Sequence, residues 1–491
     1  MVVTRDQLEI ITTPELRARV EAILNRHPAV GLAVGVVRGG QLAFLHRSGL
    51  ADIAANVPVG AGTVFRVGSI TKPFTAVAVL QLHERGLIDL DAGAGEYLRA
   101  YRLLRARPGL RRPTVRHLLT HTAGIPEVQH LSDLLHPEAG PFAGRPPIPS
   151  VPYGEPVPSL AEHLRRGLRV VGQPGTEFAY SNLGFATLGQ IVEDVSGLPL
   201  ERYFRERILD PLGMTDTGLV RSARLAARLA TGYAIGRRGV RAVPDRDWIG
   251  AGCGGLYSTV PDLARFAAAL TGAGEHGRIL EPATLPAMFA PQFRPDPRLP
   301  GWGLGLARAA AGGCLVVGHD GILPGFNSTL WIAPDDGLAV IAVTNGSPGA
   351  FGWMAAEFRG LLGAPGDVVR GDLPHHPEIW GALRGVYRLP PRISDLRGRL
   401  AVPGGAEVFV RGGRLMIRAR TPVPALYRGL PLHPDDANDP DVFRVDLSAA
   451  GQGTFRVVFG RDPAGDVVAL HADLGGQPMT LIRRRHIGAT R

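Results

Sequence analysis

Apolar runs on either side of a long helical stretch predict the strands of one antiparallel sheet. Residues 30–48, AVGLAVGVVRGGQLAFLHR, have the pattern of a hairpin with Gly39 and Gly40 at its turn. Three further runs, LVVGH, STLWIAP and LAVIAVTN, lie between Leu315 and Asn345. The helical pattern of Ala350–Leu362 predicts a helix that packs on this sheet. Apolar residues at helical spacing between Thr71 and Leu270 predict an all-helical lobe, so the fold class is α+β.

The pattern changes after Asp367, where Gly, Pro and Asp separate short β-like runs. Eight runs follow: GVYRL, AEVFV, RLMIRA, ALYRG, DVFRVDL, TFRVVFG, DVVALHA and PMTLIRR. Regularly spaced short strands predict a small antiparallel barrel or sandwich. We expect a first domain at 1–367, a linker at 368–380 and a β-barrel domain at 381–491. The adjacent His375 and His376 fit a solvated linker better than a metal site.

Composition narrows the classes of function. The chain has 491 residues, 45% of them hydrophobic and 20% charged, which is ordinary for a globular protein. The net charge of +10 comes from scattered arginines without interleaved aromatic residues, so nucleic-acid binding is not expected. Only Cys253 and Cys314 are present, without metal-ligand spacing, so no disulfide framework, metal or cofactor is predicted. The sequence shows neither a membrane-spanning run nor a signal peptide, so a cytoplasmic location away from membranes is expected unless a leader was removed.

The positive charges single out one residue. Of 54 basic residues, 53 are arginine, and Lys72 is the only lysine. Lysine can lose its proton when buried and act as a base, whereas arginine cannot. Lys72 lies three residues after Ser69, on one face at the start of a predicted helix. The pair therefore suits a serine nucleophile activated by an adjacent amine, although Ser-x-x-Lys alone also occurs by chance.

The segment around this pair and four further motifs, in a fixed order along the chain, connect it to a known family. FRVGSITKPFTAVAVLQL, HLLTHTAGIP, a Pro174–Leu219 segment with Tyr180-Ser181-Asn182, and AGCGGLYSTVPDLARF are followed by GHDGILPGFNS. Together they resemble the serine β-lactamase-related hydrolases, which include penicillin-recognising transpeptidases, class C β-lactamases, D-aminopeptidases and esterases. The resemblance covers about residues 15–365 and implies an acyl-enzyme mechanism. The C-terminal runs resemble the lipocalin-like domain of some of these hydrolases.

The resemblance implies roles for further residues. Tyr180 would relay protons, and Asn182 and His319 would position substrate. Gly321 would let substrate lie along a strand edge, and the N–H groups of Ser69 and Ile322 would form an oxyanion hole. The proline-rich segment 126–158 either borders the cleft or is a passive surface excursion.

These features predict a serine hydrolase that cleaves small esters, amides or short peptides. The family's Lys-Thr-Gly lysine is replaced by His319, which is mostly neutral at physiological pH and would be protonated only in acid. This replacement disfavours the alternative of a β-lactamase or penicillin-binding carboxypeptidase. A catalytically silent binding or regulatory protein on the same fold is the alternative of another class. Association into a homo-oligomer is left open.

Overall fold

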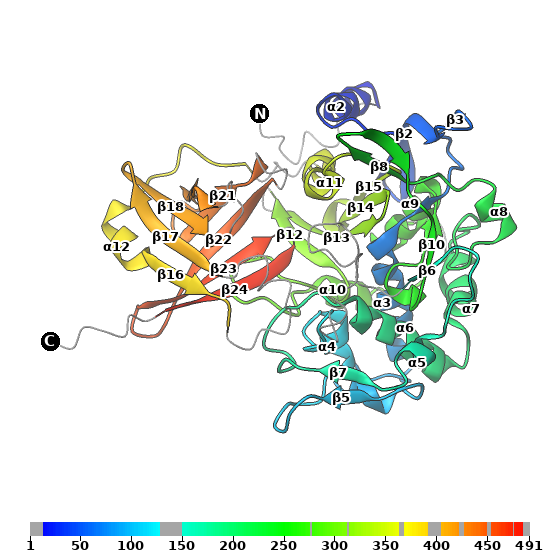
Figure 1. Cartoon of the computed structure of the whole chain (residues 1–491), viewed down its shortest axis with the longest axis horizontal. Coiled ribbons are helices and arrows are strands. Elements are labelled where there is room, and N and C mark those ends of the chain that lie inside the picture. The colour runs from blue at the N-terminus through cyan, green and yellow to red at the C-terminus, as the bar shows by residue number, and fades with distance from the viewer. Residues whose placement is uncertain are drawn as a thin grey trace.

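A computed structural model describes residues 13–127, 150–274, 277–311, 314–362, 368–390, 404–421, 427–448, 453–474 and 476–484. The first part of the chain, up to residue 362, is built on an antiparallel sheet of seven strands in the order β12-β13-β14-β15-β1-β2-β3 (Figure 1). The strands are β12 (Ala307–Ala311), β13 (Cys314–Leu323), β14 (Phe326–Ala333), β15 (Leu338–Thr344), β1 (Gly31–Arg38), β2 (Gln41–Asp52) and β3 (Val57–Pro58). The predicted hairpin is confirmed, because Gly39 and Gly40 have φ of 56° and 79°, a conformation that glycine adopts without strain.

Helices cover both faces of this sheet. Helices α2 (Thr13–Arg26) and α11 (Ala350–Arg359) share one apolar cluster with the sheet. The sequence predicted this packing for α11. Helix α9 (Val260–Leu270) packs on the other face, through residues such as Val260 and Phe266. We expected α9 in the separate helical lobe, and this was wrong. An apolar helix face shows that the helix is buried, but not which element covers it.

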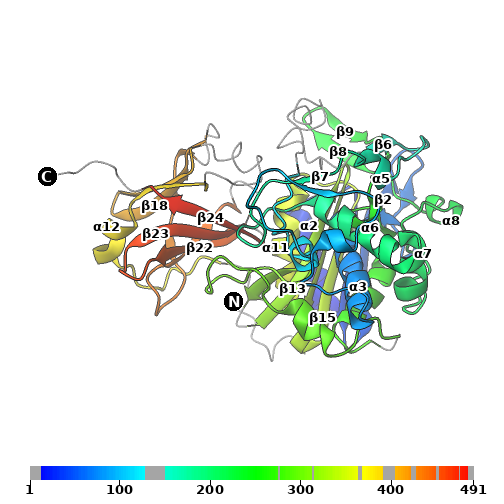
Figure 2. The same ribbon diagram turned by 90° about the horizontal axis from the view of Figure 1, so that it is seen from below.

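The remaining elements before Leu270 form the second lobe. Its helices are α3 (Thr71–Glu84), α4 (Val115–Leu119), α5 (Leu160–His163), α6 (Asn182–Ser196), α7 (Leu200–Phe204) and α8 (Ala223–Ala226), and α10 (Thr284–Phe289) follows later in the chain. The lobe is not all-helical, because it also contains short strand pairs. These are β4 (Phe65–Arg66) with β11 (Tyr257–Ser258), β5 (Leu103–Arg105) with β7 (Leu168–Val170), β6 (Ser150–Pro152) with β10 (Arg246–Trp248), and β8 (Tyr233–Gly236) with β9 (Gly239–Ala242). Figure 2 shows α3 and α6 beside the sheet, where the lobe meets it.

The C-terminal strands form a nearly closed antiparallel barrel in the order β19-β18-β17-β16-β24-β23-β22-β21-β20. They are β16 (Gly385–Arg388), β17 (Ala406–Arg411), β18 (Arg414–Ala419), β19 (Leu430–Pro431), β20 (His433–Pro434), β21 (Val442–Asp446), β22 (Thr454–Arg461), β23 (Val467–Leu474) and β24 (Gln477–Arg483). Seven of the eight predicted runs are strands. The exception is ALYRG, whose described residues 427–429 form none. The short helix α12 (Trp380–Leu383) places Trp380 in the barrel core.

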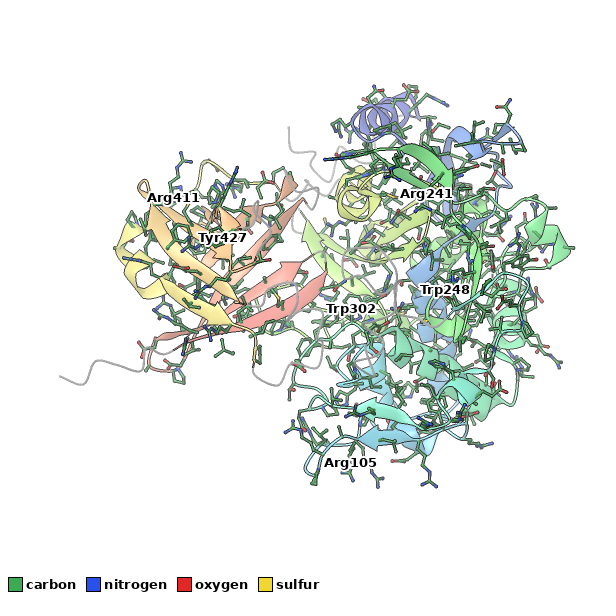
Figure 3. The ribbon with its side chains drawn as sticks, in the orientation of Figure 1. Arg105, Arg241, Trp248, Trp302, Arg411 and Tyr427 are labelled. Carbon is green, nitrogen blue, oxygen red and sulfur yellow. The ribbon has the colours of Figure 1, made fainter. Side chains whose placement is uncertain are left out.

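The loop before β12 contacts the C-terminal barrel. Arg298 binds Asp296 in its own loop and also donates to Asp439 Oδ2 at 3.0 Å and to the Phe459 carbonyl at 2.9 Å, both in the barrel. Leu299 completes the contact in a small apolar cluster with Val442 and Val458. The loop then continues to Trp302, which is labelled in Figure 3. Across the described ranges, no helix is long and apolar enough to cross a membrane.

Candidate active site

Ser69 lies in a short helical turn, η1 (Gly68–Ile70), directly before α3. Gly68 has φ of 53°, and the Thr71 hydroxyl donates to its carbonyl at 2.7 Å, which fixes the turn. Ser69 is partly exposed, whereas Gly68 and Ile70 are buried. The turn therefore presents the hydroxyl to solvent at the amino end of α3, where the helix dipole favours negative charge.

Lys72 is fully buried, and its ammonium has three acceptors. Nζ donates to Ser69 Oγ at 2.8 Å, to Asn182 Oδ1 at 2.7 Å and to the Cys253 carbonyl at 2.7 Å. Burial lowers the pKa of Lys72 to about 8, because removal from water disfavours the charged form. Three acceptors match the three hydrogens of an ammonium. Loss of one proton would leave a lone pair that can accept from the Ser69 hydroxyl.

Tyr180 reaches the same hydroxyl from another element. Its phenol donates to Ser69 Oγ at 2.9 Å, and its ring centroid lies 4.9 Å from Lys72 Nζ. His121 supports this position by stacking on the Tyr180 ring with centroids 4.3 Å apart. The backbone on both sides of Tyr180 also binds His121, since Ala179 N donates to its carbonyl and Ser181 N to Nδ1. His121 itself has φ of 57°, which is uncommon for a non-glycine residue.

Asn182 is the first residue of α6. The Ser181 side chain caps this helix by accepting from Gly184 N at 3.1 Å, and Gly197 ends it with φ of 72°. The cap directs the Asn182 side chain toward α3, where its oxygen accepts from Lys72. The predicted Ser69, Lys72, Tyr180 and Asn182 therefore meet at one point, although they come from two segments more than a hundred residues apart.

His319 lies on β13 and is 4% exposed. Its Nδ1 lies 2.6 Å from the Asp320 carbonyl, so Nδ1 must carry the hydrogen and Nε2 must be an acceptor. Burial, with the positive charge of Lys72, lowers the pKa of His319 to about 3. The expected protonation of His319 in mildly acidic solution is therefore wrong, because the reference pKa of histidine does not hold in a buried site.

Gly321 and Ile322 lie further along β13, next to the turn that carries Ser69. A Cβ atom on Gly321 would collide with the Val67 carbonyl and the Ser328 hydroxyl, which themselves are joined by a hydrogen bond of 2.7 Å. Gly321 is thus needed for close packing against Val67. Its contact with substrate stays a prediction. The next residue of β13, Ile322, lies close to the turn that carries Ser69. A Cβ atom on Gly68 would be only 3.0 Å from Ile322 N.

The sequence did not identify four groups at this site: the Glu127 carboxylate, the Cys253 carbonyl, and the side chains of His121 and Trp302. Glu127 directly follows the HLLTHTAGIP motif and accepts hydrogen bonds from Asn182. Trp302 is buried, and its ring centroid lies 5.7 Å from that of His319. His121 lies within the HLLTHTAGIP motif, so the sequence contained a signal for it. No residue pattern reveals a backbone carbonyl that accepts from a distant lysine.

Comparison with known proteins identifies the family of this chain. Residues 16–363 match the family described as Beta-lactamase. Esterase EstB of Burkholderia gladioli is 30% identical over 372 residues, which are 67% of this chain and 90% of the esterase. D-aminopeptidase of Brucella ovis is 26% identical over 72% of this chain and 64% of its own length. In fold, the octameric penicillin-binding protein homologue from Pyrococcus abyssi matches 96% of this chain with a TM-score of 0.59 and 23% identity. With most of its length matched, this chain belongs to the β-lactamase family and is a serine hydrolase.

Proposed function

We propose that the chain is an esterase or amidase that acts on small, uncharged acyl groups through an acyl-enzyme on Ser69. One observation carries this proposal. The Ser69 hydroxyl is held at 2.8 Å by a fully buried lysine and at 2.9 Å by a tyrosine. This pairing gives a weak nucleophile both a base and a proton relay. No cofactor is needed for this chemistry.

In acylation, neutral Lys72 takes the hydroxyl proton while Ser69 Oγ forms a bond to the substrate carbonyl carbon. The carbonyl oxygen becomes negative and accepts from the N–H groups of Ser69 and Ile322, which are preorganised donors. Tyr180 gives its proton to the leaving alkoxide or amine and recovers one from the Lys72 ammonium. The bond to the leaving group then breaks, and Lys72 is neutral again.

In deacylation, water takes the place of the leaving group. Tyr180 or Lys72 removes a proton from the water as its oxygen attacks the acyl carbon. The same two N–H groups stabilise the second tetrahedral intermediate. Ser69 Oγ leaves and is reprotonated, which releases the carboxylic acid and restores the starting state.

The charge around the site favours neutral substrates. His319 stands where the resemblance places a permanent cation in β-lactamases, but with a pKa of about 3 it carries no charge in neutral solution. A substrate carboxylate would therefore lose its hydration without gaining an ion pair there. The matched relatives named esterase and D-aminopeptidase support ester or amide cleavage for this chain as well.

The first experiment tests the nucleophile. The wild-type protein and Ser69→Ala are incubated with a fluorophosphonate and analysed by intact mass and peptide mapping. We expect one adduct, on the peptide that contains Ser69, and none on the variant. An unmodified wild-type protein would support the silent binding protein and refute the proposal.

The second experiment tests the substrate class. Nitrocefin, an anionic β-lactam, is compared with a neutral nitrophenyl ester, using Ser69→Ala as the background for both. We expect a larger kcat/KM for the ester. A larger value for nitrocefin would favour the β-lactamase alternative and show that charge does not govern selection.

A further inference from the structure

Glu127 is a buried carboxylate that the mechanism above does not use. It is 3% exposed, and both of its oxygens are bound by the same residue. Oε2 accepts from the Asn182 backbone N–H at 2.7 Å, and Oε1 accepts from Asn182 Nδ2 at 2.6 Å. A carboxylate that accepts two such bonds is held firmly, and it also lies at the positive end of α6.

This contact determines which way the Asn182 amide faces. A side-chain amide has a donor end and an acceptor end. Because Nδ2 is bound to Glu127, Oδ1 faces Lys72 Nζ at 2.7 Å. A rotated amide would place two N–H groups against the ammonium and leave Lys72 with only two acceptors.

We propose that Glu127 is a positioning residue of this site, which orients the Asn182 amide toward Lys72 and balances the buried ammonium with its own negative charge. The inference rests on the proposed function, because it requires Lys72 to be the base. Glu127 acts through Asn182 and through the electric field at Lys72, and it need not touch the substrate.

The electrostatics of Lys72 support this assignment. Burial lowers its pKa, and the negative charge of Glu127 opposes that change. The other groups that face Lys72 are Ser69, Tyr180, the Cys253 carbonyl and thiol, and the imidazole of His319. His319 is uncharged near neutrality, and burial raises the pKa of the Cys253 thiol to about 12, so neither supplies a negative charge. Removal of the Glu127 charge should therefore make Lys72 easier to deprotonate.

The test compares Glu127→Gln with Glu127→Asp. Glu193→Gln is the matched control, because Glu193 is also a partly buried carboxylate that accepts from the first backbone N–H of a helix. It lies near the far end of α6 and accepts from Leu200 N of α7 at 2.8 Å. For each protein, kcat and kcat/KM on a neutral nitrophenyl ester are measured between pH 6 and 9. The acid limb is the range in which kcat/KM falls as the pH falls. Folding is checked by a thermal melt.

We expect Glu127→Gln to lower kcat at least tenfold and to move the acid limb to lower pH. A movement of half a unit would raise the ratio of rates at pH 6 and pH 9 about threefold. Glu127→Asp keeps the charge but cannot reach both nitrogens, so kcat should fall while the acid limb stays in place. The control should change neither quantity.

The outcomes separate this inference from the proposed function. An active wild type whose acid limb is unchanged in Glu127→Gln would overturn the role of Glu127, and so would an equal effect in the control. If Glu127→Gln does not fold, a displaced acid limb in Glu127→Asp would overturn the charge-balance argument. An inactive wild type, or one as active as Ser69→Ala, would instead overturn the proposed function.

Discussion

The pH dependence of the reaction should report the titration of Lys72. An amine with a pKa of about 8 is neutral in about 1% of molecules at pH 6 and in about 90% at pH 9. If neutral Lys72 is the base, kcat/KM should rise about ninetyfold over this range and level off above it. Burial lowers the pKa of His319 to about 3 and raises the pKa of the Cys253 thiol to about 12, so neither group changes its charge between pH 6 and 9.

The assay uses a neutral nitrophenyl ester, so the substrate has no charge that changes with pH. Release is followed at a wavelength where both forms of nitrophenol absorb equally. The rate with Ser69→Ala is subtracted at each pH to remove hydrolysis by hydroxide. A flat profile from pH 6 to 9, or an acid limb below pH 6, would refute Lys72 as a base that must first lose its proton.

Three further predictions concern single residues. Lys72→Arg should lower kcat at least a thousandfold with the fold retained, because arginine has no accessible neutral form; an active variant in the ester assay would contradict this. Iodoacetamide at pH 8 should label the partly exposed Cys314 and spare the buried Cys253, leaving activity unchanged, as peptide mapping and a rate assay would show. Arg298→Ala should speed proteolytic cleavage of the linker at residues 374–378, because it removes side-chain contacts with the barrel and leaves the buried Asp296 carboxylate without its ion-pair partner. The exposed ion-pair variant Arg202→Ala is its control, and equal cleavage rates would show that Arg298 does not hold the two parts together.

The sequence predicted those parts of the fold that depend on local pattern. Alternating runs with glycine turns predicted the β1–β2 hairpin and most barrel strands, because side-chain alternation and turn chemistry are local properties. The partner of α9 was missed, since packing between distant elements is not encoded in one helix. The predicted strand ALYRG was wrong for its described residues 427–429, because short apolar runs also occur outside strands.

The candidate site likewise contains residues that the sequence predicted and contacts that only the folded structure shows. Ser69 and Lys72 could be predicted because they are three residues apart. Tyr180 and Asn182 could be predicted because their motif follows in the order typical of the family. The contact of Glu127 with Asn182 spans 55 residues, so it could be found only from the folded chain. The pKa of His319 also required the structure, because its displacement comes from burial that the residue type does not show.

The solitary lysine has a practical consequence for spectroscopy. Because the chain contains one lysine and that lysine lies wholly inside the site, isotope labelling of lysine would place a single probe there. A carbon or nitrogen resonance from its side chain would need no assignment by mutation, since no other lysine contributes a signal. The protonation of the base could then be observed at equilibrium, without substrate and without turnover. Acylation of Ser69 would displace one of the three Nζ contacts, so the same resonance would also report the covalent intermediate.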